Sequence, residues 1–557
     1  MNGNRRALAT CLVFLLALFS YRVHGQITTQ RLTAAPDEPQ NWLMYSGNYS
    51  STRYSPLNQI TPANVKNLKL QWVYQSPVAG NWQTSPLVVD GIMYITQRLN
   101  DVVALDATTG RAFWMYRYTP AQDRIVCCGA NNRGLAILGD TLFMGTLDAQ
   151  LIAIDAKTGH AIWKASVAKT TEGYSITHAP LVVKDKVIVG VGGGEYGIRG
   201  FIAAYDVKTG KEAWRFYTIP APGEPGSETW QRCPPNSKSF CDPDAWKHGG
   251  GSIWMTGSYD AKLNLTYWGV GNVGPDYNGD QRPGDNLYTD SVVALDADTG
   301  KLRWHYQFTP HDVYDYDSVQ VPVLVDNWDG SSINVITWAN RNGNFYAIDR
   351  ATGRFLLGKP FVKANWTSGL DAKGRPMNVK QVTQEGTLIY PGNQGGTNWY
   401  SPSFSPRTGL FYIPSWMDTY STYIKRPVDY VEGQRFTGTL PVMSVRMLQP
   451  GPLVNRRLPE EGYGAIQAFD PKTGERKWAF NMSDMTESGV LTTASDLVFA
   501  GGRDGYFFAL DAKTGALLWK ASVGGAVSAG PMTYAVGGKQ HVAISAGNAL
   551  LVYGLRP

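Results

Sequence analysis

The stretch "ALDATTGRAFW" (residues 104–114) decides the fold, because its pattern A-x-D-x-x-T-G-x-x-x-W recurs along the chain. Six copies end in this tryptophan. A seventh, "AIDRATGRFLL", has Leu357 at that position, and "NVKNLKLQW", ending at Trp72, resembles the tail of another copy. The other copies are "AIDAKTGHAIW" (153–163), "AYDVKTGKEAW" (204–214), "ALDADTGKLRW" (294–304), "AFDPKTGERKW" (468–478) and "ALDAKTGALLW" (509–519).

Each copy predicts the same small unit of structure. Alternating apolar residues predict a strand, Asp with Thr-Gly predicts a tight turn, and the tryptophan opens the outer strand. Neighbouring copies are about 40 to 53 residues apart, except at two wider gaps that hold insertions or a degenerate blade. This period, with four short strands per unit, is typical of a β-propeller. Counting Trp72 and Leu357, the sequence predicts an all-β, eight-bladed propeller whose repeats dock through tryptophans.

The composition agrees with a turn-rich β protein. Of the 557 residues, 43% are hydrophobic and 17% are charged, while glycine (60), tryptophan (18) and tyrosine (30) are abundant. The net charge is +6, and losing a leader that contains Arg5, Arg6 and Arg22 would leave 48 basic against 45 acidic residues, or +3. No basic run accompanies this small surplus, so nothing supports nucleic-acid binding.

Residues 1–25 predict a secretory signal peptide, which leaves residues 26–557 as a single propeller domain. Arg5 and Arg6 precede an apolar run of about 15 residues, "ALATCLVFLLALFSY", and "VHG" ends the segment. The alternative is an N-terminal membrane anchor. Cys11 lies at the start of the apolar run, so it is not a lipoprotein cysteine. No later segment has 18 uncharged apolar residues, so we expect an exported, soluble protein without a membrane span in the mature chain.

Export would permit disulfides among the four cysteines that follow the leader. Cys233 and Cys241 flank "PPNSKSF" and are placed to close a loop. Cys127 and Cys128 then have only each other, unless the pairs are exchanged. Adjacent cysteines can close only a strained eight-membered ring, so its purpose needs an explanation.

Several stretches carry polar or glycine-rich residues that the repeat does not require. Carboxylate and amide oxygens together suit a hard cation such as calcium, and glycine lets backbone approach a ligand closely. No H-E-x-x-H motif occurs, the seven histidines show no zinc-like spacing, and no helix pattern follows "VGGGEYG" as in a dinucleotide fingerprint. Taken singly, each residue has a structural explanation; together they indicate a site. They are Glu195 in "VGGGEYGIRG", Asn272 in "YWGVGNVGP", Asp312, Asp315 and Asp317 in "TPHDVYDYDSV", Arg341 in "WANRNGNFYAID", and Asn398 with Trp399 in "GGTNWYSPSF".

These stretches resemble the pyrroloquinoline quinone (PQQ)-dependent alcohol dehydrogenases, the quinoprotein family of methanol and ethanol dehydrogenases. The resemblance runs from "STRYSPLNQI" to "LVFAGGRDGYFFALDAKTGALLW", nearly the whole chain after the leader. "CCGANNRG" with "GGGEYGIRG", and "HDVYDYD" with "ANRNG", are specific in combination. The resemblance implies an eight-bladed propeller with PQQ in a central funnel and a metal ion beside the quinone.

For the cofactor, the resemblance implies that Cys127 and Cys128 form a vicinal disulfide ring that lies flat against one face of PQQ. Trp254, in "GGGSIWMTGSYD", would cover the other face by dispersion and stacking. Gln83, in "NWQTSPLVV", stands where the family commonly has Glu, so it can hydrogen-bond but changes the local charge. The other implied contacts are Arg133 and Thr177 to carboxylates and carbonyls, the backbone of Gly193 and Gly194, Asn398 with Trp399, and Arg341 near the reactive carbonyl.

For the metal, the resemblance implies the ligands Glu195, Asn272 and Asp315, with Asp315 also the catalytic base and Arg341 a catalytic cation. Asp317 lies two residues beyond Asp315, where an aspartate marks the lanthanide-dependent branch of the family. In an extended segment such residues face the same side, and a trivalent ion gains from one more anionic oxygen. We therefore expect a lanthanide, with calcium as the alternative and a turn-capping role as the structural explanation of Asp317.

The expected activity is oxidation of alcohols, primary ones by family default, to aldehydes with hydride transfer to PQQ. Aromatic residues around "DYNGDQRPGDN" and "NWYSPSF" are candidates for the walls of the alcohol pocket. No C-x-x-C-H haem motif occurs, so we expect an external electron acceptor such as a periplasmic c-type cytochrome. The alternatives are a non-enzymatic propeller scaffold, which the repeats alone allow, or a calcium quinoprotein acting on another alcohol, an aldehyde or a polyol.

Overall fold

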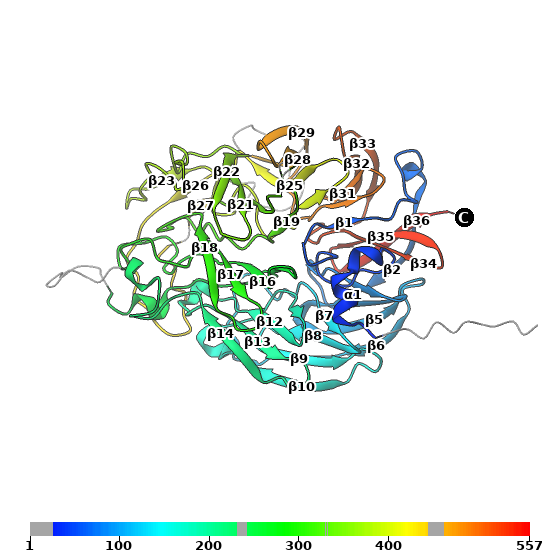
Figure 1. The fold of residues 1–557 in the computed structure, drawn as a ribbon, viewed down its shortest axis with the longest axis horizontal. Coiled ribbons are helices and arrows are strands. Elements are labelled where there is room, and N and C mark those ends of the chain that lie inside the picture. The colour runs from blue at the N-terminus through cyan, green and yellow to red at the C-terminus, as the bar shows by residue number, and fades with distance from the viewer. Residues whose placement is uncertain are drawn as a thin grey trace, which may run out of the picture.

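Within the part of the chain that the structure describes, eight sheets surround a common centre (Figure 1). Seven have four antiparallel strands, and in the remaining one a short fifth strand joins four antiparallel ones in parallel. The all-β, eight-bladed propeller predicted from the repeat is confirmed. In the described residues, no helix is long and apolar enough to cross a membrane. The predicted signal peptide and the predicted loop disulfide of Cys233 and Cys241 lie outside the described residues. This computed structural model describes residues 26–230, 242–328, 330, 332–439, 441–443 and 462–556.

Five blades are built in simple chain order, from a short inner strand to an exposed outer strand. Their bounds are β3 (Leu87–Val89), β4 (Ile92–Thr96), β5 (Val102–Asp106) and β6 (Ala112–Tyr116); β7 (Ala136–Leu138), β8 (Thr141–Gly145), β9 (Gln150–Asp155) and β10 (Ala161–Ser166); β11 (Leu181–Val183), β12 (Lys186–Gly190), β13 (Phe201–Asp206) and β14 (Glu212–Tyr217); β15 (Ser258–Asp260), β16 (Leu265–Gly269), β17 (Ser291–Asp296) and β18 (Leu302–Gln307); β19 (Val323–Val325), β20 (Val335–Ala339), β21 (Asn344–Asp349) and β22 (Phe355–Pro360).

The last three blades depart from this order. The sixth is interrupted by a small separate sheet of β23, β26 and β27, and the eighth takes its outer strand, β2, from the N-terminal part of the chain. The bounds are β24 (Ser403–Ser405), β25 (Leu410–Met417), β28 (Tyr463–Asp470) and β29 (Glu475–Asn481); β30 (Leu491–Thr493), β31 (Leu497–Gly501), β32 (Tyr506–Asp511) and β33 (Leu517–Ser522); β34 (Met532–Val536), β35 (Lys539–Ala546), β36 (Ala549–Leu555) and β2 (Leu68–Gln75); and β23 (Thr387–Ile389), β26 (Ser421–Tyr423) and β27 (Val442–Met443).

The eighth blade closes the ring by joining the two ends of the chain. β2 (blue) lies beside β36 (red) in Figure 1, with Leu68 opposite Leu555 in an antiparallel register. A second N-terminal strand, β1 (Tyr54–Ser55), pairs in parallel with β30 of the seventh blade. This pairing completes the eighth blade with a strand from the start of the described chain and so closes the ring, while each blade keeps only one short outer edge.

The tryptophan and the glycine of the repeat are explained by how neighbouring blades meet. Trp72 donates a hydrogen bond of 3.3 Å from Nε1 to the carbonyl oxygen of Ala107, which follows the aspartate of the next blade's motif. Gly110 has φ +74°, and a Cβ there would lie 2.4 Å from the Trp72 ring, so only glycine fits. The same bond recurs as Trp114–Ala156 (3.1 Å), Trp163–Val207 (3.1 Å), Trp214–Ala297 (3.2 Å), Trp304–Arg350 (3.2 Å) and Trp478–Ala512 (3.0 Å).

The copy that lacks its tryptophan keeps the docking bond by other means. Leu357 lies on β22 of the fifth blade, where the repeat predicts a tryptophan. Trp328, in the turn after β19, instead donates 2.8 Å from Nε1 to the carbonyl of Pro471 in the sixth blade. Pro471 follows Asp470 as Ala107 follows Asp106, so the contact is equivalent although the donor comes from another loop.

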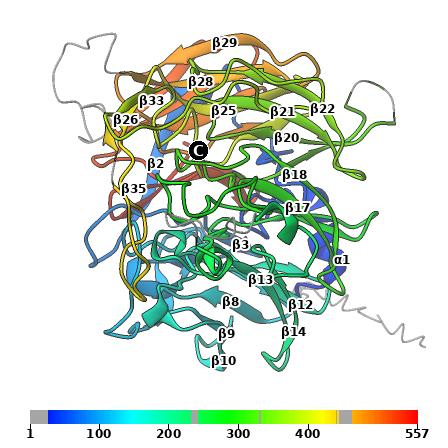
Figure 2. The ribbon, with the colours of Figure 1, turned by 90° about the vertical axis from the view of Figure 1, so that its left-hand side faces the viewer.

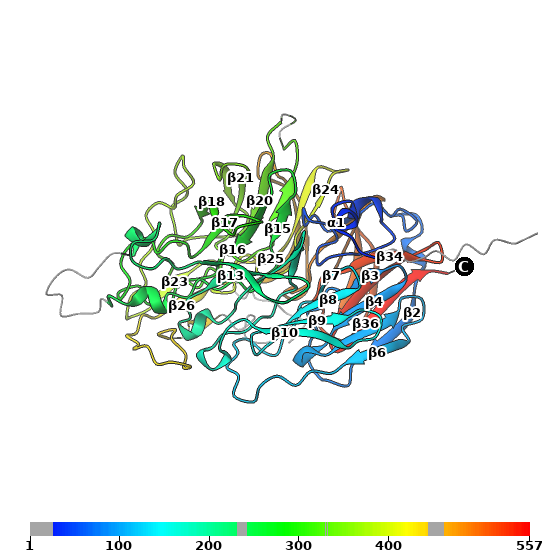
Figure 3. The same cartoon turned by 60° about the horizontal axis from the view of Figure 1, so that its bottom comes forward.

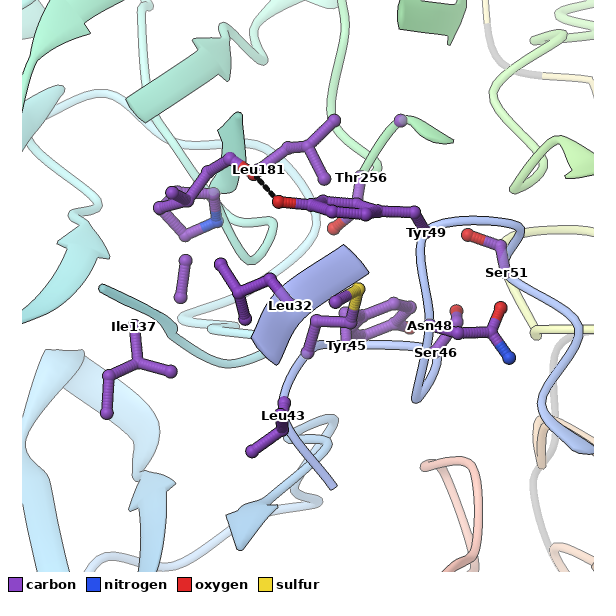
Figure 4. A pocket seen from close by; sticks show the side chains of 15 residues that line it. Leu32, Leu43, Tyr45, Ser46, Asn48, Tyr49, Ser51, Ile137, Leu181 and Thr256 are labelled. Carbon is purple, nitrogen blue, oxygen red and sulfur yellow. Dashed lines mark hydrogen bonds between the residues drawn. The ribbon is translucent and has the colours of Figure 1, made fainter. Parts of the chain in front are cut away.

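The N-terminal segment crosses one face of the propeller beside α1 (Thr29–Thr33), as Figure 3 shows. Ile27 bridges to Gly139, and Trp42 bridges to Val88 on β3. A cavity of about 20 Å³ lies between this segment and the inner strands, where the Tyr49 hydroxyl donates 2.8 Å to the carbonyl of Val182 (Figure 4). The cavity is too small for more than a water molecule, so this contact serves the fold.

A long excursion from the sixth blade reaches over its neighbours. In Figure 2 the chain after β26 (yellow) runs down the side of the molecule. Asn278 donates 2.9 Å from Nδ2 to the carbonyl of Arg426, and the backbone N–H of Phe436 donates 2.7 Å to the carbonyl of Glu195. Residues 424–439 therefore rest against the loops of other blades, next to the residues considered below.

Candidate active site

The predicted site residues lie in two kinds of loop, those that lead into the first strand of a blade and those that join its second and third strands, as at Glu195, Asn272 and Arg341. Gln83, Thr177, Trp254 and Trp399 each lie four residues before the first strand of a blade, namely β3, β11, β15 and β24. Because the blades are related by rotation about the centre, equivalent positions in these loops converge on one space. That space is a cavity of about 360 Å³, within the size range of small-molecule sites.

Almost all the residues predicted from the sequence line this cavity. The exceptions are Gly194, Asn272 and Asp312. Gly194 and Asn272 are neighbours, since a Cβ on Gly194 would be 3.3 Å from Oδ1 of Asn272. Asp312 is completely buried and accepts hydrogen bonds from the backbone N–H groups of Tyr314 and Tyr316, so its role is structural. The cavity is lined by the predicted residues Gln83, Cys127, Cys128, Arg133, Thr177, Gly193, Glu195, Trp254, Asp315, Asp317, Arg341, Asn398 and Trp399, and also by Asn131, Ser175, Gly192, Gln394, Tyr400 and Glu487.

Cys127 and Cys128 form a disulfide with each other, as predicted. The ring lies at the rim of the cavity, where Cys128 is exposed, and Sγ of Cys128 is 3.7 Å from Oε1 of Glu195. Because both sulfur atoms are covalently paired, they are not available as metal ligands beside Glu195. The disulfide therefore forms part of the cavity wall.

Arg133 places a cation between two aromatic rings. Its guanidinium carbon lies 5.1 Å from the ring centroid of Trp254 and 4.7 Å from that of Trp399, and Nη1 donates 2.9 Å to Oγ1 of Thr177. Burial lowers the pKa of Arg133 to about 10, which leaves it charged at neutral pH. Nε has no hydrogen-bond partner among the described residues, so the side chain suits an anionic ligand.

Two predicted amide side chains also face this space. Oε1 of Gln83 is buried without a hydrogen-bond partner in the described part of the chain. Asn398 uses Oδ1 to accept 2.8 Å from the backbone N–H of Trp399, and Nδ2 donates 3.2 Å to the carbonyl of Gln394. Gln83 thus has an acceptor to offer a ligand, whereas Asn398 is partly fixed by its own loop.

Glu195 is presented by a short 3₁₀ turn, Gly194–Tyr196. Gly193 precedes it with φ +121°, and a Cβ there would lie 2.1 Å from the carbonyl of Gly173, so close packing within the protein requires this glycine. Arg199, four residues after Glu195, could have been expected to pair with it, but its guanidinium pairs at 2.9 Å with Glu224. Glu195 therefore lines the cavity without an ion pair to Arg199.

Arg341 binds the two aspartates that the sequence placed two residues apart. Nη2 donates 2.9 Å to Oδ2 of Asp315, Nη1 donates 2.5 Å to Oδ2 of Asp317, and Nε donates 2.6 Å to the carbonyl of Asn393. Oδ1 of Asp317 also accepts 2.9 Å from the backbone N–H of Asn272. Asp315 has φ +61°, a strained conformation for a residue other than glycine that Asp tolerates better than most.

The electrostatics of this cluster favour a bound cation. Burial, and then repulsion from Asp315, Glu195 and Asp317, raises the pKa of Asp276 well above its usual value. Burial also raises the pKa of Glu195 and of Asp315, although Arg341 opposes the shift at Asp315. Of these four carboxyl groups, only Asp315 and Asp317 pair with the buried Arg341, so a bound cation would relieve the remaining repulsion among them.

These residues fit a hard metal ion and a planar, anionic cofactor. Oδ1 of Asp276 is buried with no hydrogen-bond partner among the described residues, and oxygen atoms of carboxylates and amides dominate the donor set. On the same cavity wall, the disulfide ring, the Trp254 ring and the Arg133 guanidinium offer flat surfaces and a positive charge. This donor set matches the metal ion and the PQQ that the resemblance implies.

Sequence reasoning missed Asp276 and Glu487, and it named Tyr277, in "DYNGDQRPGDN", only as a candidate wall of the alcohol pocket, whereas Tyr277 does not line the cavity. Asp276 and Tyr277 lie in "GPDYNGD", just after Asn272, and a carboxylate beside a predicted ligand was a usable signal. Glu487, in "TESGV", belongs to no motif, but it lies four residues before an inner strand, as Gln83 does. Glu487 can be identified only from its position relative to the first strand of its blade, which the structure supplies.

The comparisons with known proteins agree with this geometry. The PQQ family described as the glucose/ethanol/alcohol dehydrogenase β-propeller domain matches residues 42–360 and 481–542. A quinohemoprotein alcohol dehydrogenase, ADH IIB of Pseudomonas putida, is 39% identical over 91% of this chain and 73% of its own length. The lanthanide-dependent methanol dehydrogenase of Methylacidiphilum fumariolicum is 37% identical over 92% of this chain and 85% of its own.

The solved structure of a europium-containing methanol dehydrogenase superposes with a TM-score of 0.86 at 33% identity, covering 94% of this chain and 100% of that one. The chain therefore belongs to the family of PQQ-dependent alcohol dehydrogenases, which are quinoprotein oxidoreductases.

Proposed function

We propose that the protein oxidises alcohols, primary alcohols in particular, to aldehydes in a PQQ-dependent reaction. The observation that carries the proposal is the pairing of Asp315 with Arg341 on the wall of a cavity that also contains the vicinal disulfide and Trp254. A carboxylate base beside a buried cation suits removal of a proton from a hydroxyl group. Family membership favours this enzyme over the non-enzymatic scaffold that the repeats alone allowed.

Named residues would hold the cofactor by contacts that suit its chemistry. The Cys127–Cys128 ring and Trp254 would pack on the planar rings, and Arg133 would pair with a carboxylate. The further proposed contacts are the side chains of Gln83, Thr177, Arg341, Asn398 and Trp399 and the backbone of Gly193 and Gly194.

Glu195, Asn272, Asp315 and Asp317 would hold the metal ion, and we propose a lanthanide. Two observations support this proposal. Asp317 adds a carboxylate, and the chain is 37% identical in sequence to a methanol dehydrogenase that is named lanthanide-dependent. Calcium is the alternative, because Asp317 is already bound by Arg341 and by the N–H of Asn272 and can serve to position Arg341.

The chain's own residues account for the proton in the reaction. Oδ2 of Asp315 accepts hydrogen bonds from Arg341 and Tyr277, so Oδ1 is the atom that would take the proton of the alcohol hydroxyl. Arg341 keeps the carboxyl group oriented and adds positive charge next to the reacting atoms. When bound, PQQ supplies the acceptor of the hydride from the carbinol carbon, and the metal supplies Lewis acidity.

The setting of the reaction follows from the sequence and the relatives. Residues 1–25 would direct export to the periplasm, and a c-type cytochrome or another external acceptor would remove the electrons. Several relatives are named quinohemoproteins, which supports electron transfer to a cytochrome-type partner.

The decisive test replaces Asp315 with Asn, which tolerates the same backbone conformation. We expect kcat of dye-linked alcohol oxidation to fall by about 10²- to 10⁴-fold, the range for loss of a general base, while PQQ binding persists. Asp290→Asn is the matched control, because Asp290 is fully buried but does not line the cavity. Full activity in Asp315→Asn would refute the assignment.

A further inference from the structure

The blade register identifies a cavity residue that neither the motifs nor the proposed function uses. Glu487 lies four residues before β30 in the seventh blade, the position that Gln83, Thr177 and Trp254 occupy in theirs. Like them, it lines the cavity. In the eighth blade the same register position is Ser528, four residues before β34. Glu487 is thus placed by rotational repetition in the ring of residues that faces the cofactor cavity.

The two carboxylate oxygens of Glu487 differ in their contacts. Oε2 accepts 3.0 Å from the hydroxyl of Ser528, and Oε1 lies 3.9 Å from Nη1 of Arg503. The Glu487 side chain is 27% exposed, whereas that of Arg503 is 3% exposed. One carboxylate oxygen is therefore fixed by a hydrogen bond, and the other is too far from Arg503 to be fixed in the same way.

Glu487 is not needed to neutralise Arg503. Nη2 of Arg503 already makes an ion pair of 3.0 Å with Oδ1 of Asp484, which is completely buried. The guanidinium carbon also lies 5.4 Å from the ring centroid of Trp416. Because Arg503 has this closer carboxylate, an additional glutamate on the cavity side needs another explanation.

The charge of the cavity supplies that explanation. Position 83, where the resemblance expects a glutamate, carries the neutral amide of Gln83. Glu487 provides a carboxyl group at the equivalent position of the seventh blade. It is two blades from Gln83, with Ser528 of the eighth blade between them. Burial raises the pKa of Glu487, while Arg503 and Ser528 oppose the shift.

We propose that Glu487 is a further cofactor-binding residue whose carboxyl group, held by Ser528, hydrogen-bonds the polar edge of PQQ. PQQ carries carboxylates, carbonyls and a pyrrole N–H along that edge, so a carboxyl group there finds a donor or an acceptor. This inference rests on the proposed function, because it assumes that the cavity binds PQQ.

The test measures PQQ affinity rather than turnover. Apo-protein, variants and metal are titrated with PQQ, and binding is followed by calorimetry and by quenching of tryptophan fluorescence. Glu487→Ala should raise Kd about tenfold, the effect of one hydrogen bond with partial charge, and Glu487→Gln should raise it less because the amide can still bond. Glu475→Ala, on the exposed outer strand β29, is the control and should leave Kd unchanged.

The outcomes separate this inference from the proposed function. If wild type binds PQQ and Glu487→Ala binds within twofold of it, the inference is wrong and the proposed function stands. If wild type does not bind PQQ, the proposed function fails. Should Glu487→Ala not fold, as judged by circular dichroism, Ser528→Ala decides: a roughly threefold weaker Kd supports the inference, and an unchanged Kd overturns it.

Discussion

The hydroxyl group of Tyr277 donates a hydrogen bond of 3.1 Å to Oδ2 of Asp315. The same oxygen accepts 2.9 Å from Nη2 of Arg341, so two donors fix one side of the carboxylate. Tyr277 itself is 3% exposed, and its ring packs 5.8 Å from that of Tyr423. The orientation of the proposed base thus depends on a residue that does not line the cavity.

Removing this hydroxyl should weaken catalysis without abolishing it. A hydrogen bond to a charged group stabilises by about 1.5–3 kcal/mol, and part of this remains through Arg341, so Tyr277→Phe should lower kcat roughly tenfold. Steady-state oxidation of a primary alcohol with saturating PQQ and metal measures the effect.

Tyr423→Phe is the matched control for this prediction. Tyr423 is also buried beside Tyr277, but its hydroxyl donates 3.0 Å to the carbonyl of Tyr314 instead of Asp315. We expect it to lower stability but to leave kcat near that of wild type. Equal losses of kcat in both variants would show that packing, and not the bond to Asp315, is what matters.

Asp317 should decide the preference of the site between metal ions. A trivalent ion gains more than a divalent ion from each anionic oxygen, so Asp317→Asn should weaken lanthanum binding at least tenfold more than calcium binding. Competition with terbium, followed by its luminescence in the PQQ-loaded protein, measures both affinities.

A different result for Asp317 would still be informative. Because Asp317 accepts 2.5 Å from Arg341 and 2.9 Å from the N–H of Asn272, the asparagine variant also tests a positioning role. Equal weakening of both metals would mean that Asp317 orients Arg341 and Asn272 and does not select the ion.

Reducing the vicinal disulfide should affect cofactor binding and leave stability almost unchanged. The ring closes a loop with a sequence separation of 1, so it removes almost no chain entropy from the unfolded state. Cys128 is exposed, which lets a reductant reach the ring. Thiol reductant, or the double change to serine, should raise the Kd for PQQ about tenfold or more while Tm shifts by no more than about 2 °C. A large loss of Tm would instead make the disulfide a structural element.

The repeat was sufficient to predict the architecture because the spacing of its residues determines the turn and docking contacts that they make. Asp106 accepts the N–H of Thr108 at 2.7 Å and the hydroxyl of Thr109 at 3.0 Å, and Gly110 makes room for the preceding tryptophan. Such contacts follow from spacing alone. Trp328 could not be found in this way, because its docking bond to Pro471 comes from a turn outside the repeat.

The site was predictable where the family motifs cover it and not elsewhere. The structure brings Glu195, Asp315 and Arg341 to one cavity, as the resemblance implies, although they are far apart in sequence. Tyr277 and Glu487 depend on how separate blades approach one another, which is a tertiary property that no local pattern encodes.

His178, which follows the cavity residue Thr177 in the sequence, should make the stability of the fold depend on pH. The ring is completely buried, Nε2 accepts 3.0 Å from the N–H of Gly190, and Nδ1 donates 2.8 Å to the carbonyl of Ala179. This arrangement satisfies the neutral ring, and protonation of Nε2 would break the bond to Gly190. Burial accordingly lowers the pKa of His178 to about 4, from an ordinary value of 6.5.

The sign of the effect follows from these two pKa values. Above pH 6.5 the ring is neutral in both the folded and the unfolded protein, so His178 adds no pH dependence. As the pH falls from 6.5 toward 4, only the unfolded chain takes up the proton, so the free energy of unfolding should drop by about 1.4 kcal/mol per pH unit from this residue. Urea unfolding of wild type and His178→Gln between pH 7.5 and 5 measures the difference in slope. The exposed His160→Gln should keep the wild-type slope, and an unchanged slope in His178→Gln would mean that other buried groups cause the acid sensitivity.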